Sequence, residues 1–67
     1  MKDNVFGKNL RNLRIGEGLS QRILGERLDV CNQTVSFWES GSREPDLDTL
    51  VKISELFNVS VDFLLTE

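Results

Sequence analysis

The 67-residue sequence contains no histidine, no tyrosine and only one cysteine. One cysteine cannot form an internal disulfide, and without histidine the chain offers neither an ordinary zinc site nor a Cys–His nucleophilic pair. No set of nucleophile, base and orienting group is visible either. We therefore expect no metal, no other cofactor, no catalytic residue, no small-molecule substrate and no enzymatic activity.

Long hydrophobic runs and signal-like segments are also missing. No apolar stretch approaches the roughly 18 residues that a membrane span requires, and the N-terminus lacks the pattern of a signal peptide. The sequence therefore predicts a cytoplasmic chain with no membrane contact, organised as one domain over residues 1–67. A domain of this length has modest stability unless association supports it.

The most informative segment is residues 19–41, which predict two short helices joined by a four-residue turn. In the first helix, Ser20 is a good N-cap, and two leucines repeat one turn apart behind it. Gly25 costs about 1 kcal/mol relative to alanine inside a helix, which indicates that the next helix approaches closely there. Asp29 begins the turn and is expected to have a positive φ.

The second helix, expected over residues 32–40, has two different sides. Val35 and Trp38 share the side that packs, and four residues project from the opposite side: Gln33, Ser36, Phe37 and Ser40. A small protein can insert such a helix into the major groove of DNA. There the amides of Asn32 and Gln33 can pair with the N6 and N7 atoms of adenine, which is a bidentate match.

Three further positions around these helices suggest DNA contacts. Phe37 is a large apolar group within an outward polar stripe, so a thymine methyl is a natural contact, and an ordinary exposed aromatic is the alternative. Gln21 lies in the first turn of its helix, where free amides and the positive helix end bind phosphate; a solvated residue is its alternative. Four basic side chains could lie near phosphate or could be solvated charges: Lys8, Arg11, Arg22 and Arg43. Arg43, which follows the second helix, is the best placed of them to touch the DNA backbone.

Six segments taken together resemble the Cro/C1-type (XRE family) helix-turn-helix repressors of bacteria and phages. They are FGKNLRNLR at 6–14, GLSQ at 18–21, LGERLDV at 24–30, TVSFWESG at 34–41, REPDLDTL at 43–50 and LFNVSVDFLL at 56–65. The resemblance implies an all-α, compact five-helix, lambda-repressor-like domain that binds double-stranded DNA. It places the 32–40 helix in the major groove and the 20–28 helix across the phosphate backbone.

The resemblance also implies roles for individual residues. In this family, base edges are reached by the residues that match Asn32, Gln33 and Phe37. Phosphate is commonly contacted by the residues that match Gln21, Thr34 and Ser40. We expect the outward-facing Ser36 and the loop residue Arg43 to contact phosphate as well.

The family pairs an arginine of the first helix with a glutamate of the recognition helix, here Arg14 and Glu39. The residues support this pair independently, because Glu39 falls toward the packed side of its helix and Arg14 lies one turn beyond Leu10, at the edge of an apolar stripe. A buried carboxylate needs a partner, and a guanidinium gives a bidentate bond that fixes orientation. Two unrelated surface charges are the alternative.

Three positions depart from the family's pattern. Cys31 stands where Ser or Thr usually caps the recognition helix, and a thiol is a weak acceptor, so the cap should be poorer. Asp29 replaces the usual turn glycine, and Phe37 stands where Lys or Arg is frequent. With fewer charges near phosphate, non-specific binding should be weaker and less steeply dependent on salt.

The rest of the chain predicts a supporting scaffold. A first helix is expected from about residue 4 to 16, started by Asp3 or Asn4 and ended by the GEG segment at 16–18. After Pro45, Asp46 caps a helix whose core residues recur at helical spacing: Leu47, Leu50, Ile53 and Phe57.

Ser60 caps a last short helix that is more apolar than one buried face requires. Its apolar residues predict the interface of a homodimer: Val61, Phe63, Leu64 and Leu65. Such a dimer would set two recognition helices one DNA turn apart, about 34 Å, on a near-palindromic operator. The alternative is that Leu64 and its neighbours close a small core.

The net charge of −3 is unusual for a DNA-binding chain. Residues 1–43 carry seven basic and five acidic side chains, a balance of +2, whereas residues 44–67 carry one basic and six acidic side chains, a balance of −5. If the C-terminal half points away from DNA, its charges lie beyond a Debye length of about 8 Å and are largely screened. We therefore expect a sequence-specific DNA-binding transcriptional regulator, specifically a repressor. The alternative is an antitoxin-like or adaptor protein whose acidic half binds another protein.

Overall fold

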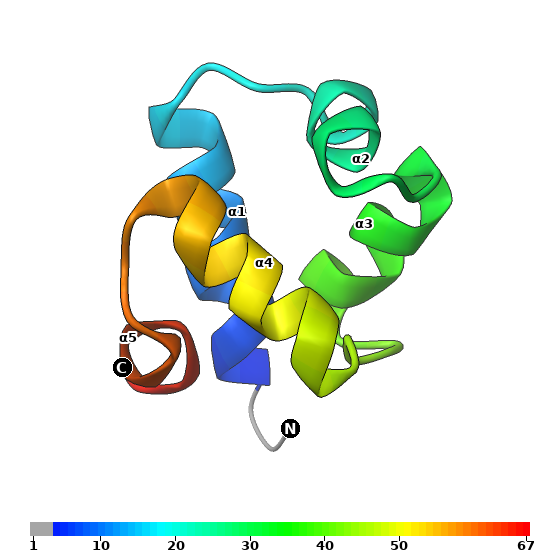
Figure 1. Ribbon diagram of the computed structural model, residues 1–67. Helices are drawn as coiled ribbons and strands as arrows, with labels where there is room; N and C mark the ends of the chain where they lie inside the picture. Colours follow the sequence, from blue (N-terminus) through cyan, green and yellow to red (C-terminus); the bar gives the residue numbers. More distant parts are fainter. Residues whose placement is uncertain (1–3) are drawn as a thin grey trace.

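The computed structural model describes residues 4–67, which fold into five α-helices (Figure 1). These are α1 (Val5–Gly16), α2 (Gln21–Leu28), α3 (Asn32–Ser40), α4 (Leu47–Phe57) and α5 (Val61–Leu65). The all-α, five-helix prediction is confirmed, and the two central helices agree with their predicted ranges to within one residue. None of the helices within this part of the chain is long and apolar enough to cross a lipid bilayer.

The helices surround one apolar core. α2 and α3 pack against each other and lie together on one side of the molecule, whereas α5 packs against α1 and α4 on the opposite side (Figure 1). All five helices contribute to the buried apolar side chains of residues 4–67, which are Phe6, Leu10, Leu24, Leu28, Val35, Trp38, Leu50, Ile53 and Leu64. The core therefore fixes the back of α3 against the rest of the domain.

Side-chain caps define the starts of three helices. Ser20, Asp46 and Ser60 each accept the backbone N–H of the residue three positions later, at 3.0, 2.8 and 2.9 Å. These bonds satisfy amides that have no partner within the helix, and they confirm the three predicted N-caps. Hydrogen bonds from the side chain and backbone of Thr49 hold the pKa of the Asp46 carboxyl below its ordinary value.

Two scaffold predictions require correction. Asn4 directly precedes α1, but it has φ 52° and its side chain does not cap the helix; Nδ2 instead donates to the carbonyl oxygen of Glu39 at 3.0 Å. Asp3, the other predicted cap, lies outside the described residues. Leu47 is 79% exposed and does not belong to the core. It is the first residue of α4, one turn before the first buried residue of that helix, Leu50.

Two glycines permit close contacts between helices. A Cβ atom on Gly25 would lie 2.6 Å from the carbonyl oxygen of Val30, in the turn that leads into α3. A Cβ atom on Gly7 would lie 2.5 Å from the carbonyl oxygen of Trp38. The close approach predicted at Gly25 is therefore present, and the structure adds a second one, between α1 and the end of α3.

Asn9 holds α5 against α1. Its Nδ2 donates to the carbonyl oxygens at the end of α5, those of Phe63, Leu64 and Thr66, at 3.1, 3.0 and 2.9 Å. In this position Leu64 is fully buried, so it closes the core and cannot form part of a surface interface. Phe63 and Leu65 remain 51% and 37% exposed, and Val61 packs partly buried against the core.

Candidate nucleic-acid interface

The helix α3 has one buried side and one accessible side, as its sequence predicts. Val35 is fully buried and Trp38 is 5% exposed, and these two side chains anchor the helix to the core. Asn32 and Gln33 are exposed at the opposite side, and Phe37 is 41% exposed one turn further on. The three residues predicted to read bases therefore lie on one accessible surface of a helix whose back is fixed.

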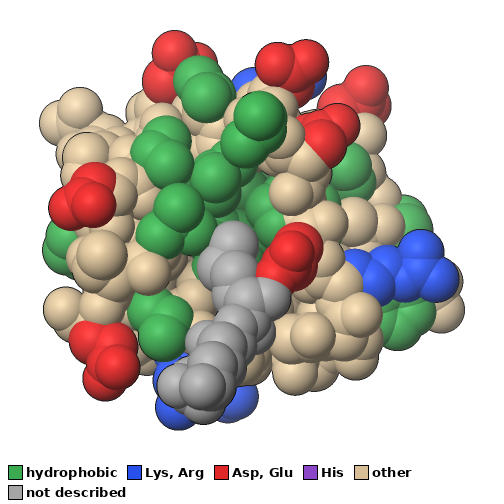
Figure 2. Space-filling view, turned by 90° about the horizontal axis from the view of Figure 1, so that it is seen from below, with side chains coloured by type: hydrophobic (Ala, Val, Ile, Leu, Met, Phe, Trp, Pro, Cys, Tyr) green, Lys and Arg blue, Asp and Glu red, His purple; other side chains and the backbone are tan. Residues whose placement is uncertain are grey.

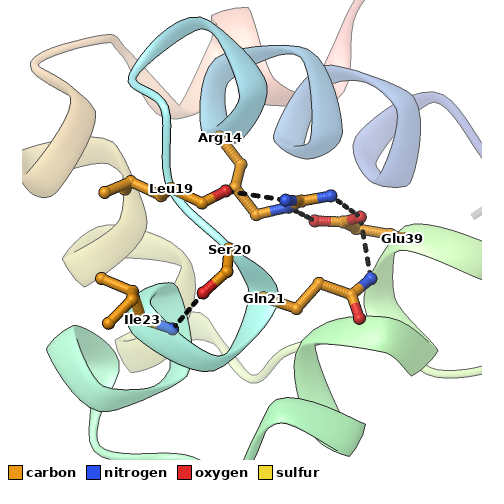
Figure 3. Close-up of polar contacts among 6 residues, drawn as sticks. All are labelled: Arg14, Leu19, Ser20, Gln21, Ile23 and Glu39. Carbon is orange, nitrogen blue, oxygen red and sulfur yellow. Dashed lines mark hydrogen bonds and ion pairs between the residues drawn. The ribbon is translucent and has the colours of Figure 1, made fainter.

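The predicted ion pair between α1 and α3 is present and largely buried (Figure 3). Arg14 Nε lies 2.6 Å from Glu39 Oε2, and Nη2 donates to Oε1 at 3.1 Å. The two side chains are only 13% and 6% exposed. Arg14 Nη1 also donates to the carbonyl oxygen of Leu19 at 2.8 Å, just before α2. The bidentate geometry therefore orients α3 relative to α1.

Gln21 joins the same network from the first turn of α2. Its Nε2 donates to Glu39 Oε1 at 3.1 Å, so the carboxylate of α3 is bonded to both α1 and α2 (Figure 3). One amide N–H of Gln21 is thereby used inside the protein. A phosphate can be reached only by the remaining N–H groups, because the side-chain oxygen cannot donate a hydrogen bond.

The N-terminal end of α3 lacks a strong cap. Asp29 has φ 61° in the turn, as predicted, and Cys31 forms no side-chain hydrogen bond to the helix backbone. Cys31 Sγ instead lies 3.3 Å from Thr34 Oγ1. The hydrogen bond with the Thr34 side chain lowers the pKa of this exposed thiol. The weaker cap expected from cysteine is therefore present.

The loop after α3 turns back onto the helix. The carbonyl oxygen of Phe37 accepts the backbone N–H groups of Ser42 and Arg43 at 3.0 and 3.3 Å and the Ser40 hydroxyl at 3.1 Å. The guanidinium carbon of Arg43 consequently lies 5.3 Å from the centroid of the Phe37 ring. This contact was not predicted from the sequence, although an aromatic residue and an arginine on either side of a glycine-containing turn are a signal for it.

A polar hollow of about 300 Å³ lies where α1, α2 and α3 meet. It is lined by Arg11, Arg14, Gln21, Ser36, Glu39 and Ser40. Three predicted phosphate-contacting residues are thus brought together around one hollow, and the exposed Arg11 adds a positive charge beside them. Within residues 4–67, no group of His, Cys, Asp or Glu side chains is arranged to hold a metal ion.

The comparisons with known proteins agree with this geometry. The family model described as helix-turn-helix matches residues 10–64. The HTH-type transcriptional regulator ImmR of Bacillus subtilis is 44% identical over 60 residues, which cover 90% of this chain and 47% of ImmR. The chain thus spans about half the length of this curated relative.

Two solved structures share the fold. The P22 c2 repressor, solved in complex with a synthetic operator, superimposes with a TM-score of 0.85 at 30% identity, covering 90% of this chain and 91% of that chain. The restriction-modification controller protein C.AhdI of Aeromonas hydrophila gives a TM-score of 0.82 at 31% identity, covering 96% of this chain and 98% of that chain. The chain belongs to the Cro/C1-type (XRE) helix-turn-helix family of transcriptional regulators.

Proposed function

We propose that this chain binds double-stranded DNA sequence-specifically and acts as a transcriptional repressor, with α3 inserted in the major groove. The observation that carries the proposal is the two-sided burial of α3. Its back is held by Val35 and Trp38, while Asn32 and Gln33 are exposed at the front. A rigid helix with accessible amides suits the major groove, where adenine offers a matching acceptor and donor.

In this arrangement Asn32, Gln33 and Phe37 contact base edges. The amides form hydrogen bonds, and the partly exposed Phe37 ring supplies an apolar contact. The ion pair between Arg14 and Glu39 supports these base contacts indirectly, since it fixes the orientation of α3 relative to α1.

The phosphate contacts come from the start of α2, from α3 and from the loop that follows α3. Gln21 offers its remaining N–H groups, and Thr34 and Ser36 offer half-buried hydroxyls beside the base-reading surface. Ser40 donates to Phe37 in the free protein and would have to turn its hydroxyl outward. Arg43 adds a positive charge, which attracts phosphate and makes affinity depend on salt.

A homodimer on a near-palindromic operator completes the proposal. Figure 2 shows hydrophobic side chains gathered on the face seen from below, with acidic side chains around them. The exposed apolar residues of the packed helices α4 and α5 include Leu47, Val51, Phe63 and Leu65. A second copy of the chain would remove these groups from water, and the two-fold symmetry would present two copies of α3 to successive major grooves.

The experiment begins by selecting bound duplexes from a random DNA pool, which reports the site, its spacing and its symmetry. On the selected duplex, Gln33→Ala should raise Kd by the equivalent of about 1–3 kcal/mol and leave binding to unrelated duplex unchanged. Asn12→Ala is the matched control, because Asn12 is an exposed amide of α1 outside the proposed interface. It should leave both affinities unchanged.

Binding should also weaken linearly with the logarithm of salt concentration, since counterions are released from DNA. If no duplex is enriched, or if Gln33→Ala has no effect at an enriched site, the base-reading role of α3 is wrong. In the absence of DNA binding, the acidic and apolar face of α4 and α5 favours the adaptor function, in which another protein occupies that face.

A further inference from the structure

Phe37 and Arg43 contact each other on the accessible side of α3, beside the amides of Asn32 and Gln33. The guanidinium carbon lies 5.3 Å from the ring centroid, within the range of a cation–π interaction. The backbone N–H of Arg43 also donates to the carbonyl oxygen of Phe37 at 3.3 Å. Arg43 is therefore held against Phe37 by both its backbone and its side chain.

This contact restricts the ring while leaving part of it accessible. A partly exposed aromatic side chain at the surface of a helix can otherwise exchange between rotamers. Here the guanidinium lies over the ring, yet Phe37 remains 41% exposed on the accessible side of α3. The contact thus favours one orientation of the ring, whose remaining apolar surface lies one helical turn beyond Gln33.

The major groove presents one kind of apolar group to such a surface, which is the 5-methyl group of a pyrimidine. Thymine carries this methyl, and cytosine lacks it unless it is methylated. A thymine and a 5-methylcytosine place the methyl at the same position of the ring. A protein that contacts only the methyl therefore gains the same contact from both bases.

We propose that Phe37, oriented by Arg43, reads the 5-methyl group of a pyrimidine, so that DNA binding responds to cytosine methylation as well as to thymine. This inference rests on the proposed DNA-binding function. Phe37 contacts the base, and Arg43 is a positioning residue that lies over the ring. The outer N–H groups of Arg43 can contact phosphate at the same time, because a guanidinium carries five donors.

The test uses the duplex selected from the random pool. Each thymine is replaced in turn by deoxyuridine, which removes only the methyl group. At one position per half-site Kd should rise about fourfold, the equivalent of about 0.8 kcal/mol for one buried methyl. At that position, 5-methylcytosine paired with guanine should bind about fourfold more tightly than cytosine paired with guanine.

The variants assign the effect to the two residues. Phe37→Ala should bring the thymine-to-uracil ratio of affinities to one. Arg43→Lys keeps the positive charge but loses the planar guanidinium, so it should lower this ratio and leave the salt dependence unchanged. Ile15→Ala removes a 55% exposed apolar side chain of α1 and should change neither quantity.

The outcomes separate this inference from the function on which it rests. If the protein enriches a duplex but binds it equally with thymine and uracil at every position, methyl reading is wrong and DNA binding stands. A ratio that survives Phe37→Ala also overturns the inference. If no duplex is enriched, the proposed function itself fails.

Discussion

The buried ion pair between Arg14 and Glu39 predicts a large loss of stability when one partner is removed. The two side chains are 13% and 6% exposed, so the remaining charge would stay mostly away from water. Removing one member of a buried pair typically costs about 3–5 kcal/mol. Glu39→Ala would also leave the Gln21 amide and two N–H groups of Arg14 without their acceptor. We therefore expect a loss within that range.

This loss is comparable to the stability of the whole domain. At about 0.05–0.15 kcal/mol per residue, a chain of this length is stabilised by roughly 3–10 kcal/mol. Urea denaturation followed by circular dichroism measures the change, with Glu39→Gln as a second variant in case Glu39→Ala does not fold. Glu39→Gln keeps a side-chain acceptor and removes the charge, so its loss should be smaller.

A matched control is the exposed ion pair between Arg22 and Glu26. Its nitrogen–oxygen distance of 2.7 Å resembles that of the buried pair, but the side chains are 68% and 59% exposed. Pairs of this kind at i,i+4 spacing contribute about 0.3–0.5 kcal/mol, so Glu26→Ala should change stability little. Equal effects of Glu39→Ala and Glu26→Ala would refute the reasoning, because burial would then have no influence.

Three further predictions concern single residues. Asn9→Ala should lower stability by about 0.5–1.5 kcal/mol and speed amide hydrogen exchange in α5, because the carbonyl oxygens at the end of this helix lose their side-chain donor. Iodoacetamide should modify Cys31 faster in the unchanged protein than in the Thr34→Val variant, since Thr34 lowers the pKa of the thiol. Adding the selected duplex should slow the reaction. The folded-state pKa of Asp46 lies below its ordinary value of 3.8. The ionised carboxylate therefore contributes to folding stability above that pH, and this contribution is lost as the pH falls through the lowered pKa. In urea titrations at decreasing pH, Asp46→Asn should lack this part of the loss of stability.

Local chemistry explains why much of the fold could be predicted from the sequence. A hydroxyl or carboxylate at an N-cap satisfies amides only three residues away, so Ser20, Asp46 and Ser60 define helix starts without knowledge of the rest of the molecule. The two sides of α3 follow in the same way from helical periodicity, which places Val35 and Trp38 on the packed side.

Helical spacing was less informative about where packing stops. Leu47 lies on the same stripe as Leu50 and Ile53, yet it is exposed at the first position of α4. Leu64 gives the opposite result. Because its helix has more apolar residues than one buried face requires, Leu64 was predicted to lie in a dimer interface, but it is fully buried in the core. Periodicity states which residues share a side, and only the docking of helices decides which of them are covered.

The hydrogen bonds of uncharged side chains to distant segments could not be predicted. Asn9 bonds to carbonyl oxygens 54 to 57 residues later in the chain, and Asn4 bonds to that of Glu39. A polar side chain on a helix gives no sequence signal for such a partner, because any of the carbonyl groups at a helix end could accept its proton. The ion pair of Arg14 and Glu39 was predictable because a charge on the packed side of a helix requires an opposite charge.

The distribution of charge along the chain explains how a chain with a net negative charge can bind DNA. Within the described residues 4–43, six basic and four acidic side chains give a balance of +2, and Glu39 is already paired with Arg14. The excess negative charge belongs to residues 44–67, which form the end of the loop, α4 and α5. These are also the elements proposed to meet in the dimer, so like charges surround its apolar face. Salt would screen that repulsion and favour the proposed dimer, whereas it would weaken the proposed phosphate contacts of α2 and α3. We therefore expect the two halves of the domain to respond to ionic strength in opposite directions.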